Sequence, residues 1–202
     1  MWFDAQEDVV RCVQVLPPYD WLFIGTNPFD GMTREFAESF DLFMNVSDCP
    51  HEVLLPEKPR PDTRMLWYPV AELSDWTYGP FYWSKRVLDE ALEKKTQTYL
   101  HCDSGVNRSP CIAMAWLTSK KHSLEEAALL ISRERESYAD TRVSRFQRNI
   151  EQGYIPKQLP EFYARCEEYL VEGFQLDYDN ILYKDPPIVA LPERLAKFRG
   201  KK

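Results

Sequence analysis

The 202-residue sequence lacks the features of several large protein classes. It has no apolar run long enough to span a membrane, and its opening residues, MWFDAQED, are acidic and do not resemble a signal peptide. It also has no excess of basic residues, because 32 Asp and Glu outnumber 25 Lys and Arg and give a net charge of −7. This charge disfavours general electrostatic binding to nucleic acid or anionic membranes. We therefore expect no membrane association and a cytoplasmic or nuclear location.

The cysteines also show no framework of disulfides or metal ligands. There are five, an odd number, and none of their spacings has the pairing typical of zinc sites. This usage fits a reducing compartment, and we expect no metal site. Cys49 and Cys111 are candidates for a reversible disulfide with an oxidised Cys102, and the alternative is a buried apolar role for both.

The composition that is present favours one folded domain, since 44% of residues are hydrophobic and 14% aromatic. Strand-like and helical patterns alternate along the chain, which predicts a single α/β domain with a central, mainly parallel sheet of four to five strands flanked by helices. We assign residues 1–173 to this domain and residues 174–202 to an extended tail. Strands are expected at 9–15, 21–24, up to 46, 65–68 and 97–100, and helices at 33–40, 80–95, 110–117, 123–134, 140–152 and 160–172. Thr33 can cap the first of these helices, and Ser123 and Glu126 form a capping box at the start of the helix at 123–134. Asp140 or Thr141 can cap the helix at 140–152, which Gly153 ends.

Residues 100–110, with the sequence LHCDSGVNRSP, form the most informative segment. Cys102 and Arg108 lie six positions apart on a tight loop between an apolar strand and a helix that has Pro110 in its first turn. The backbone N–H groups of such a loop and of the helix start converge into a cradle for an anion, and the same dipoles stabilise negative charge on the sulfur. This arrangement suits a cysteine nucleophile that attacks a bound phosphate ester.

The other side chains of the loop fit the same chemistry. Arg108 can hold two phosphate oxygens as a fork, and Gly105 lets the backbone curl towards the anion. The Ser109 hydroxyl can donate to the sulfur and help the thiolate to leave, whereas His101 is expected to hold the loop rather than act as an acid or base. The residues expected to surround the phosphate are Asp103, Ser104, Gly105, Val106, Asn107 and Arg108.

The pattern His101-Cys102-x5-Arg108-Ser109 resembles the phosphate-binding loop of the cysteine-based protein tyrosine phosphatases. The flanking sequence and compact size are most similar to the dual-specificity branch, over roughly residues 10–155. The resemblance implies hydrolysis of phosphomonoesters on phosphotyrosine and phosphoserine/threonine proteins, through a cysteinyl-phosphate intermediate and without a cofactor. No segment resembles the tyrosine-recognition segment of the larger tyrosine-only enzymes, which implies a shallow pocket open to all three phosphorylated residues.

The family also uses a general acid, an Asp on a mobile loop upstream of the cysteine. The loop between residues 69 and 79 offers Glu72 and Asp75. Counting from the flanking elements places Glu72 at the family position, but Asp75 has the expected side chain and lies beside Trp76, which could screen it from water. We favour Asp75 as the acid and keep Glu72 as the alternative.

Two other functions stay open at this stage. The Asn107-Arg108 pair also occurs in the related RNA 5′-triphosphatases, so removal of phosphate from RNA ends or nucleotides is one alternative, although the acidic charge disfavours a nucleic-acid partner. We favour loop-stabilising hydrogen bonding as the role of Asn107. The other alternative is a pseudophosphatase that binds phosphorylated proteins without turnover, which the intact Cys102 and Arg108 argue against. The sequence leaves the physiological substrate and the oligomeric state undetermined.

Overall fold

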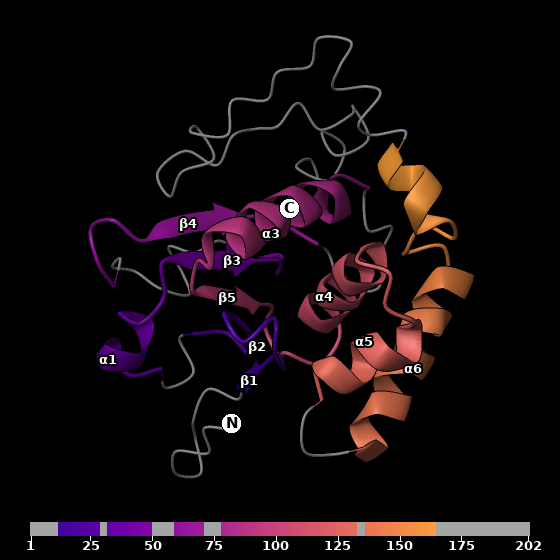
Figure 1. Ribbon diagram of the computed structural model, residues 1–202, viewed down its shortest axis with the longest axis horizontal. Coiled ribbons are helices and arrows are strands. Elements are labelled where there is room, and N and C mark those ends of the chain that lie inside the picture. Colours follow the sequence, from indigo (N-terminus) through magenta and orange to yellow (C-terminus); the bar gives the residue numbers. More distant parts are fainter. Residues whose placement is uncertain (1–11, 29–31, 50–58, 71–77, 133–135, 165–202) are drawn as a thin grey trace, which may run out of the picture.

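The computed structural model describes residues 12–28, 32–49, 59–70, 78–132 and 136–164 (Figure 1). Its strands form one five-stranded sheet in the order β1-β2-β5-β3-β4. Within it β1 pairs antiparallel with β2, and the other pairs are parallel. The predicted α/β fold with a mainly parallel sheet is therefore confirmed. The strands are β1 Cys12–Gln14, β2 Leu22–Gly25, β3 Leu42–Asn45, β4 Arg64–Trp67 and β5 Thr98–His101.

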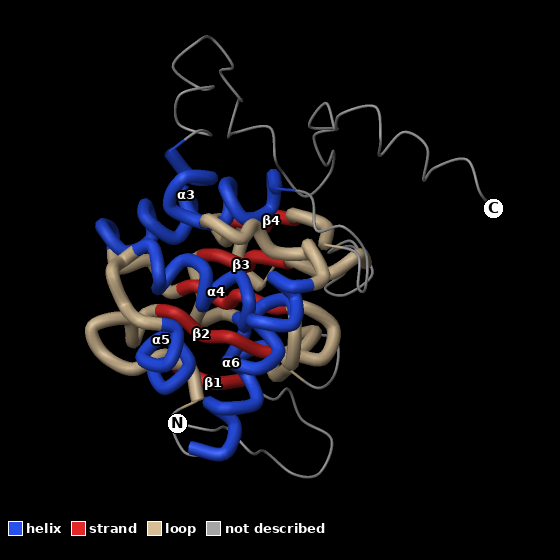
Figure 2. The backbone as a smooth tube through the Cα atoms, turned by 90° about the vertical axis from the view of Figure 1, so that its right-hand side faces the viewer, coloured by secondary structure: helices blue, strands red, loops and turns tan. Residues whose placement is uncertain are grey.

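Helices cover both faces of this sheet, and Figure 2 shows α4, α5 and α6 in front of the stacked strands. The described helices are α1 Arg34–Ala37, α3 Tyr78–Lys94, α4 Arg108–Ser119, α5 Leu124–Leu130 and α6 Glu136–Glu151. A further helical stretch starts at residue 159 and continues to the end of the described chain at residue 164. No helix in the described ranges combines the length and apolar character that crossing a membrane requires.

Alternation along the strands produces two separate cores. Successive strand residues point to opposite faces of a sheet. Leu42 and Met44 therefore join one buried cluster with residues of α3, α4, α5 and α6, whereas Phe43 joins a second cluster with Ala37 of α1 and with Phe40, which follows α1. In Figure 1, α1 and the group α4 to α6 lie on opposite sides of the strands. The sheet is thus fixed from both faces, which holds its strand ends in place.

Several predicted helix caps and helix ends can be compared with the structure. Thr33 caps α1 by accepting from the Phe36 N–H at 3.3 Å, as predicted. Ser123 and Glu126 form the predicted capping box, with distances of 2.8 and 3.1 Å, although α5 ends at Leu130 rather than near residue 134. The end of α6 before Gly153 is also confirmed.

The predicted start of α6 was wrong. Asp140 and Thr141 were expected to cap this helix, but the helix begins at Glu136 and both residues lie inside it. Residues 136–139 contain neither proline nor glycine, so nothing in them stops the helix from extending one turn towards the N-terminus. The predicted tail, residues 174–202, lies outside the described residues.

The capping box of α5 predicts a measurable loss of stability. Ser123→Ala removes the acceptor for the Glu126 N–H, and we expect the free energy of unfolding to fall by about 1 kcal/mol in urea titrations. Ser144→Ala, at an exposed position inside α6, is the matched control and should leave stability nearly unchanged. Equal stability of the Ser123→Ala and native proteins would show that this cap does not support the helix in solution.

Candidate active site

The loop that carries Cys102 lies at the carboxyl end of the central strand β5. Its neighbours β2 and β3 end level with it, because Gly25 and Asn45 both pair with His101. Ligands of open parallel sheets bind outside the carboxyl ends of the strands, where loops from several strands meet. The sheet therefore brings the segments after β2, β3 and β4 to the same place as the Cys102 loop.

The loop itself turns sharply at Gly105. This residue has a φ of +64°, in the left-handed region that favours glycine, and an added Cβ would lie 2.8 Å from the backbone carbon of Gly25. The Asn27 N–H donates to the Asp103 carbonyl at 2.9 Å and ties the loop to the segment after β2. The loop is therefore packed so closely against the end of β2 that only glycine fits at its turn.

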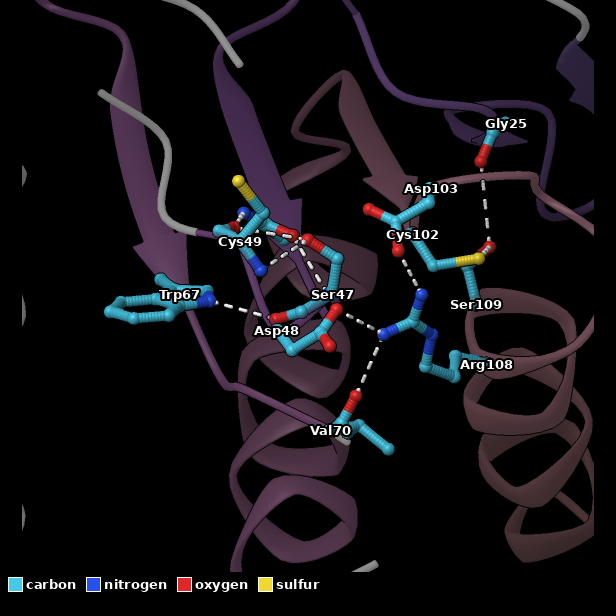
Figure 3. A network of polar contacts seen from close by, with 11 residues as sticks. Gly25, Ser47, Asp48, Cys49, Trp67, Val70, Cys102, Asp103, Arg108 and Ser109 are labelled. Carbon is cyan, nitrogen blue, oxygen red and sulfur yellow. Dashed lines mark hydrogen bonds and ion pairs between the residues drawn. The ribbon is translucent and has the colours of Figure 1, made fainter. Parts of the chain in front are cut away.

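Cys102 lies at the base of the loop and is 1% exposed. The Ser109 hydroxyl, in the first turn of α4, is 3.3 Å from its Sγ and 3.5 Å from the Gly25 carbonyl oxygen (Figure 3). A hydroxyl at this distance can stabilise a sulfur anion. The N-terminal end of α4 also faces the loop, and its dipole favours negative charge there.

Arg108 is the most heavily engaged side chain of the site and is 2% exposed. Its Nη1 donates to Asp48 Oδ1 at 2.8 Å and to the Val70 carbonyl at 2.9 Å, and its Nη2 donates to the Asp103 carboxylate (Figure 3). Burial lowers the pKa of Arg108, but hydrogen bonds and charges of Asp48 and Asp103 outweigh it, so the pKa is raised. Burial raises the pKa of Asp48, but the hydrogen bond and charge of Arg108, together with hydrogen bonds from the Asp48 backbone and Asp103, outweigh burial, so this pKa is lowered.

Residues of α6 support the loop from the side. Asn149, which is buried, donates through Nδ2 to Asn107 Oδ1 at 3.0 Å and to Cys111 Sγ at 3.4 Å. Arg145 donates to the Val106 carbonyl at 3.4 Å. Asn107 is therefore part of the structure that holds the loop, which fits the loop-stabilising interpretation of this residue better than a role in reading RNA.

Comparison with known proteins agrees with this geometry. The sequence model described as "Dual specificity phosphatase, catalytic domain" matches residues 22–152, well over half of the chain. The chain belongs to the dual specificity phosphatase family. This places it among phosphatases of the cysteine-based tyrosine phosphatase superfamily, as the sequence predicted. A search of curated proteins found no match.

Solved structures share the fold of this phosphatase at low sequence identity. A mutant form of Tk-PTP is 21% identical, with a TM-score of 0.51, and the match covers 73% of this chain and 92% of that one. A mouse putative dual specificity phosphatase is 21% identical, with a TM-score of 0.50 and coverage of 77% and 97%. A kinase associated phosphatase is 13% identical, with a TM-score of 0.51 and coverage of 74% and 98%.

The remaining predicted residues of the phosphatase fall into three groups. His101 is fully buried and packs against the Tyr99 ring at 5.6 Å, while its carbonyl accepts from the Val46 N–H at 2.8 Å. Ser104 and Val106 are exposed at the loop surface. Glu72 and Asp75 lie outside the described residues, but Val70, two residues before Glu72, accepts a hydrogen bond from Arg108 through its carbonyl.

The described cysteines, Cys12, Cys49, Cys102 and Cys111, are free. Burial raises the pKa of Cys111 to about 12, which makes it a poor thiolate near neutral pH. The pKa of Cys49 is also raised, by burial and by the charges of Asp103 and Asp48. Cys111 packs in the main core, which fits the apolar alternative for this residue.

Sequence reasoning missed two residues of the site, Asp48 and Asn149. Asp48 lies just after β3, and the Cys102 loop lies just after β5. Because the carboxyl ends of parallel strands meet at one edge of a sheet, a polar residue at this position could have been recognised as a candidate site residue. Asn149 gave no comparable signal, because its contact depends on how α6 packs against α4.

The tight turn at Gly105 predicts a selective loss of activity. Gly105→Ala should reduce kcat/KM for p-nitrophenyl phosphate by at least about 100-fold, because the loop must shift away from Gly25. Gly153→Ala is the matched control: its φ is also positive, at +80°, but no atom lies within 4 Å of the added Cβ. That control should lose about 1 kcal/mol of stability and keep its activity. Similar activities for the two variants would contradict the tight packing of the loop.

Proposed function

We propose that this phosphatase hydrolyses phosphomonoesters on phosphotyrosine and phosphoserine/threonine proteins through a cysteinyl-phosphate intermediate. The observation that carries the proposal is the position of Cys102 Sγ, 3.3 Å from the Ser109 hydroxyl at the base of a loop that ends in a buried arginine. The kinase associated phosphatase of similar fold was crystallised with its catalytic site cysteine replaced by serine. That relative supports a nucleophilic cysteine in this fold.

In the first step the Cys102 thiolate attacks phosphorus in line with the leaving oxygen. A sulfur–phosphorus bond forms, and the bond between phosphorus and the bridging oxygen breaks. Loop N–H groups and Arg108 hold the three non-bridging oxygens, whose charge is spread in the transition state. The leaving alcohol or phenol takes its proton from Asp75 or, in the alternative, Glu72.

In the second step water cleaves the cysteinyl phosphate. The carboxylate that donated its proton now accepts one from the attacking water, and the sulfur–phosphorus bond breaks. The electron pair returns to the sulfur, where the Ser109 hydroxyl stabilises the thiolate. Inorganic phosphate is released, and the side chains return to their starting protonation states without a cofactor.

Protein substrates fit the charge of the site better than RNA does. Asp48 and Asp103 lie beside the buried Arg108, and their exposed parts make this side of the site acidic. A polyanion approaching along this side is repelled. Asn107, the residue that suggested the RNA 5′-triphosphatases, is hydrogen-bonded to Asn149. The described residues therefore give no support to that alternative.

The nucleophile is tested by hydrolysis of p-nitrophenyl phosphate at about pH 6 in EDTA and reductant. We expect Cys102→Ser to lower kcat by at least about 1,000-fold, because an alcohol at this position stays protonated. Cys12→Ser, at a buried cysteine on β1, is the control and should keep its activity. Absence of turnover by the native chain, together with phosphopeptide binding that depends on Arg108, would replace this proposal with the pseudophosphatase.

The general acid is tested by comparing two classes of leaving group. Asp75→Asn should reduce kcat/KM by about 100-fold or more for an alkyl phosphate and by much less for p-nitrophenyl phosphate, whose phenol leaves without a proton. Glu72→Gln is the matched variant and should affect both substrates little. The reverse pattern would assign the acid to Glu72, and equal small effects from both variants would mean that neither residue donates the proton.

A further inference from the structure

Two carboxylates share one buried guanidinium, and the reaction described above uses neither of them. Asp48 and Asp103 contact Arg108 through different nitrogens, Nη1 and Nη2 (Figure 3). The Arg108 side chain is 2% exposed, whereas those of Asp48 and Asp103 are 60% and 44% exposed. The positive charge of Arg108 is therefore buried, whereas the carboxylates of Asp48 and Asp103 beside it are exposed to solvent.

This arrangement restricts how a phosphate can bind Arg108. A bidentate grip uses two parallel N–H groups on one edge of the guanidinium. The two N–H groups of Nη1 are directed to Asp48 Oδ1 and the Val70 carbonyl. A grip through Nε and Nη2 would use the nitrogen that the Asp103 carboxylate contacts. A phosphate held by two parallel N–H groups of Arg108 must therefore share Nη2 with Asp103 or displace the Asp103 carboxylate from Nη2.

Displacement leaves the carboxylates in need of another cation. Before phosphate binds, the guanidinium of Arg108 faces the two described carboxylates of Asp48 and Asp103, and a dianionic phosphate then takes over part of that positive charge. Like charges that lose their shared counter-ion repel each other. On the α6 side, by contrast, Arg145 contacts the loop through the Val106 carbonyl. The carboxylates that lose their counter-ion therefore lie on the side of the loop that faces the end of β3.

We propose that Asp103 competes with substrate phosphate for Arg108, and that the carboxylates of Asp103 and Asp48 then select phosphoproteins with Lys or Arg beside the phosphorylated residue. This inference rests on the proposed function and names its substrate class. A substrate ammonium or guanidinium group replaces the counter-ion that the carboxylates lose, whereas a substrate Glu or Asp adds to the repulsion.

The experiment uses three phosphotyrosine peptides of equal length with Lys, Gln or Glu on both sides of the phosphotyrosine. For each peptide kcat/KM is measured, and inorganic phosphate is titrated as a competitive inhibitor. The variants are Asp103→Asn and Asp48→Asn. The matched control is Asp20→Asn, which makes the same change in net charge at an exposed residue before the start of β2, at the end of the strand away from the site.

The native chain should prefer the Lys peptide over the Glu peptide by about tenfold. Asp103→Asn should bind inorganic phosphate about three- to tenfold more tightly, because the internal competitor is gone, and its peptide preference should shrink to about threefold or less. Asp48→Asn should also reduce the preference for the Lys peptide over the Glu peptide. Asp20→Asn should match the native chain in both measurements.

Three outcomes would overturn the inference. Weaker phosphate binding by Asp103→Asn would mean that Asp103 positions Arg108 instead of competing for it. Equal kcat/KM values for the three peptides, or a higher value for the Glu peptide, would show that the chain does not select basic substrates. Equal peptide preferences in native, Asp103→Asn and Asp48→Asn proteins would place the selectivity elsewhere.

The inference can also be separated from the proposed function. The same peptides are titrated by calorimetry onto the Cys102→Ser protein with and without Asp103→Asn, so that affinity is compared without turnover. Tighter binding of the Lys peptide that depends on Asp103, in a chain whose native form does not hydrolyse phosphate esters, would overturn the proposed catalysis and support the charge selection. Hydrolysis of phosphate esters by the native chain, with no preference among the peptides in kcat/KM or in affinity, would support the proposed catalysis and overturn the charge selection.

Discussion

Arg108 carries a buried positive charge, and a buried guanidinium is tolerated only where hydrogen-bond acceptors surround it. Among the described residues its acceptors come from three separate segments: Asp48 after β3, Val70 after β4, and Asp103 within its own loop. The charge therefore links the ends of neighbouring strands to the start of α4. Removing any one acceptor changes the position of the group that the phosphate must meet, so the chemistry depends on the whole edge of the sheet.

The parallel sheet makes this convergence possible. The carboxyl ends of β2, β5 and β3 lie level with one another, at Gly25, His101 and Asn45. The segments that follow these residues therefore meet directly at the edge of the sheet. The two cores on opposite faces keep these strand ends in register, since a slip of one residue would exchange their side chains between the cores. The positions of Cys102 and Ser109 thus rest on packing far from the sulfur.

Features that depend on neighbouring residues were predictable from the sequence. The Cys102–Arg108 loop, the Thr33 and Ser123 caps and the strand–helix alternation each involve residues only a few positions apart. Long-range pairings were not predictable, because Asp48 is 60 positions from Arg108 and Asn149 is 42 from Asn107. The start of α6 was misplaced because good capping residues at 140 and 141 also fit inside a helix that nothing interrupts. The choice between Asp75 and Glu72 depends on the shape of a loop, which spacing alone does not fix.

The bonds from Asn149 to Asn107 and Cys111 set a lower limit on the length of a working catalytic unit. A fragment ending after α5 would contain all of the Cys-x5-Arg motif, yet its loop would lack the polar support that α6 supplies. The family's matched region ends at residue 152, one residue beyond the last residue of α6. The end of the matched region therefore coincides with the end of α6, the last helix among the described residues that contacts the loop, so the sequence motif depends on support from outside itself.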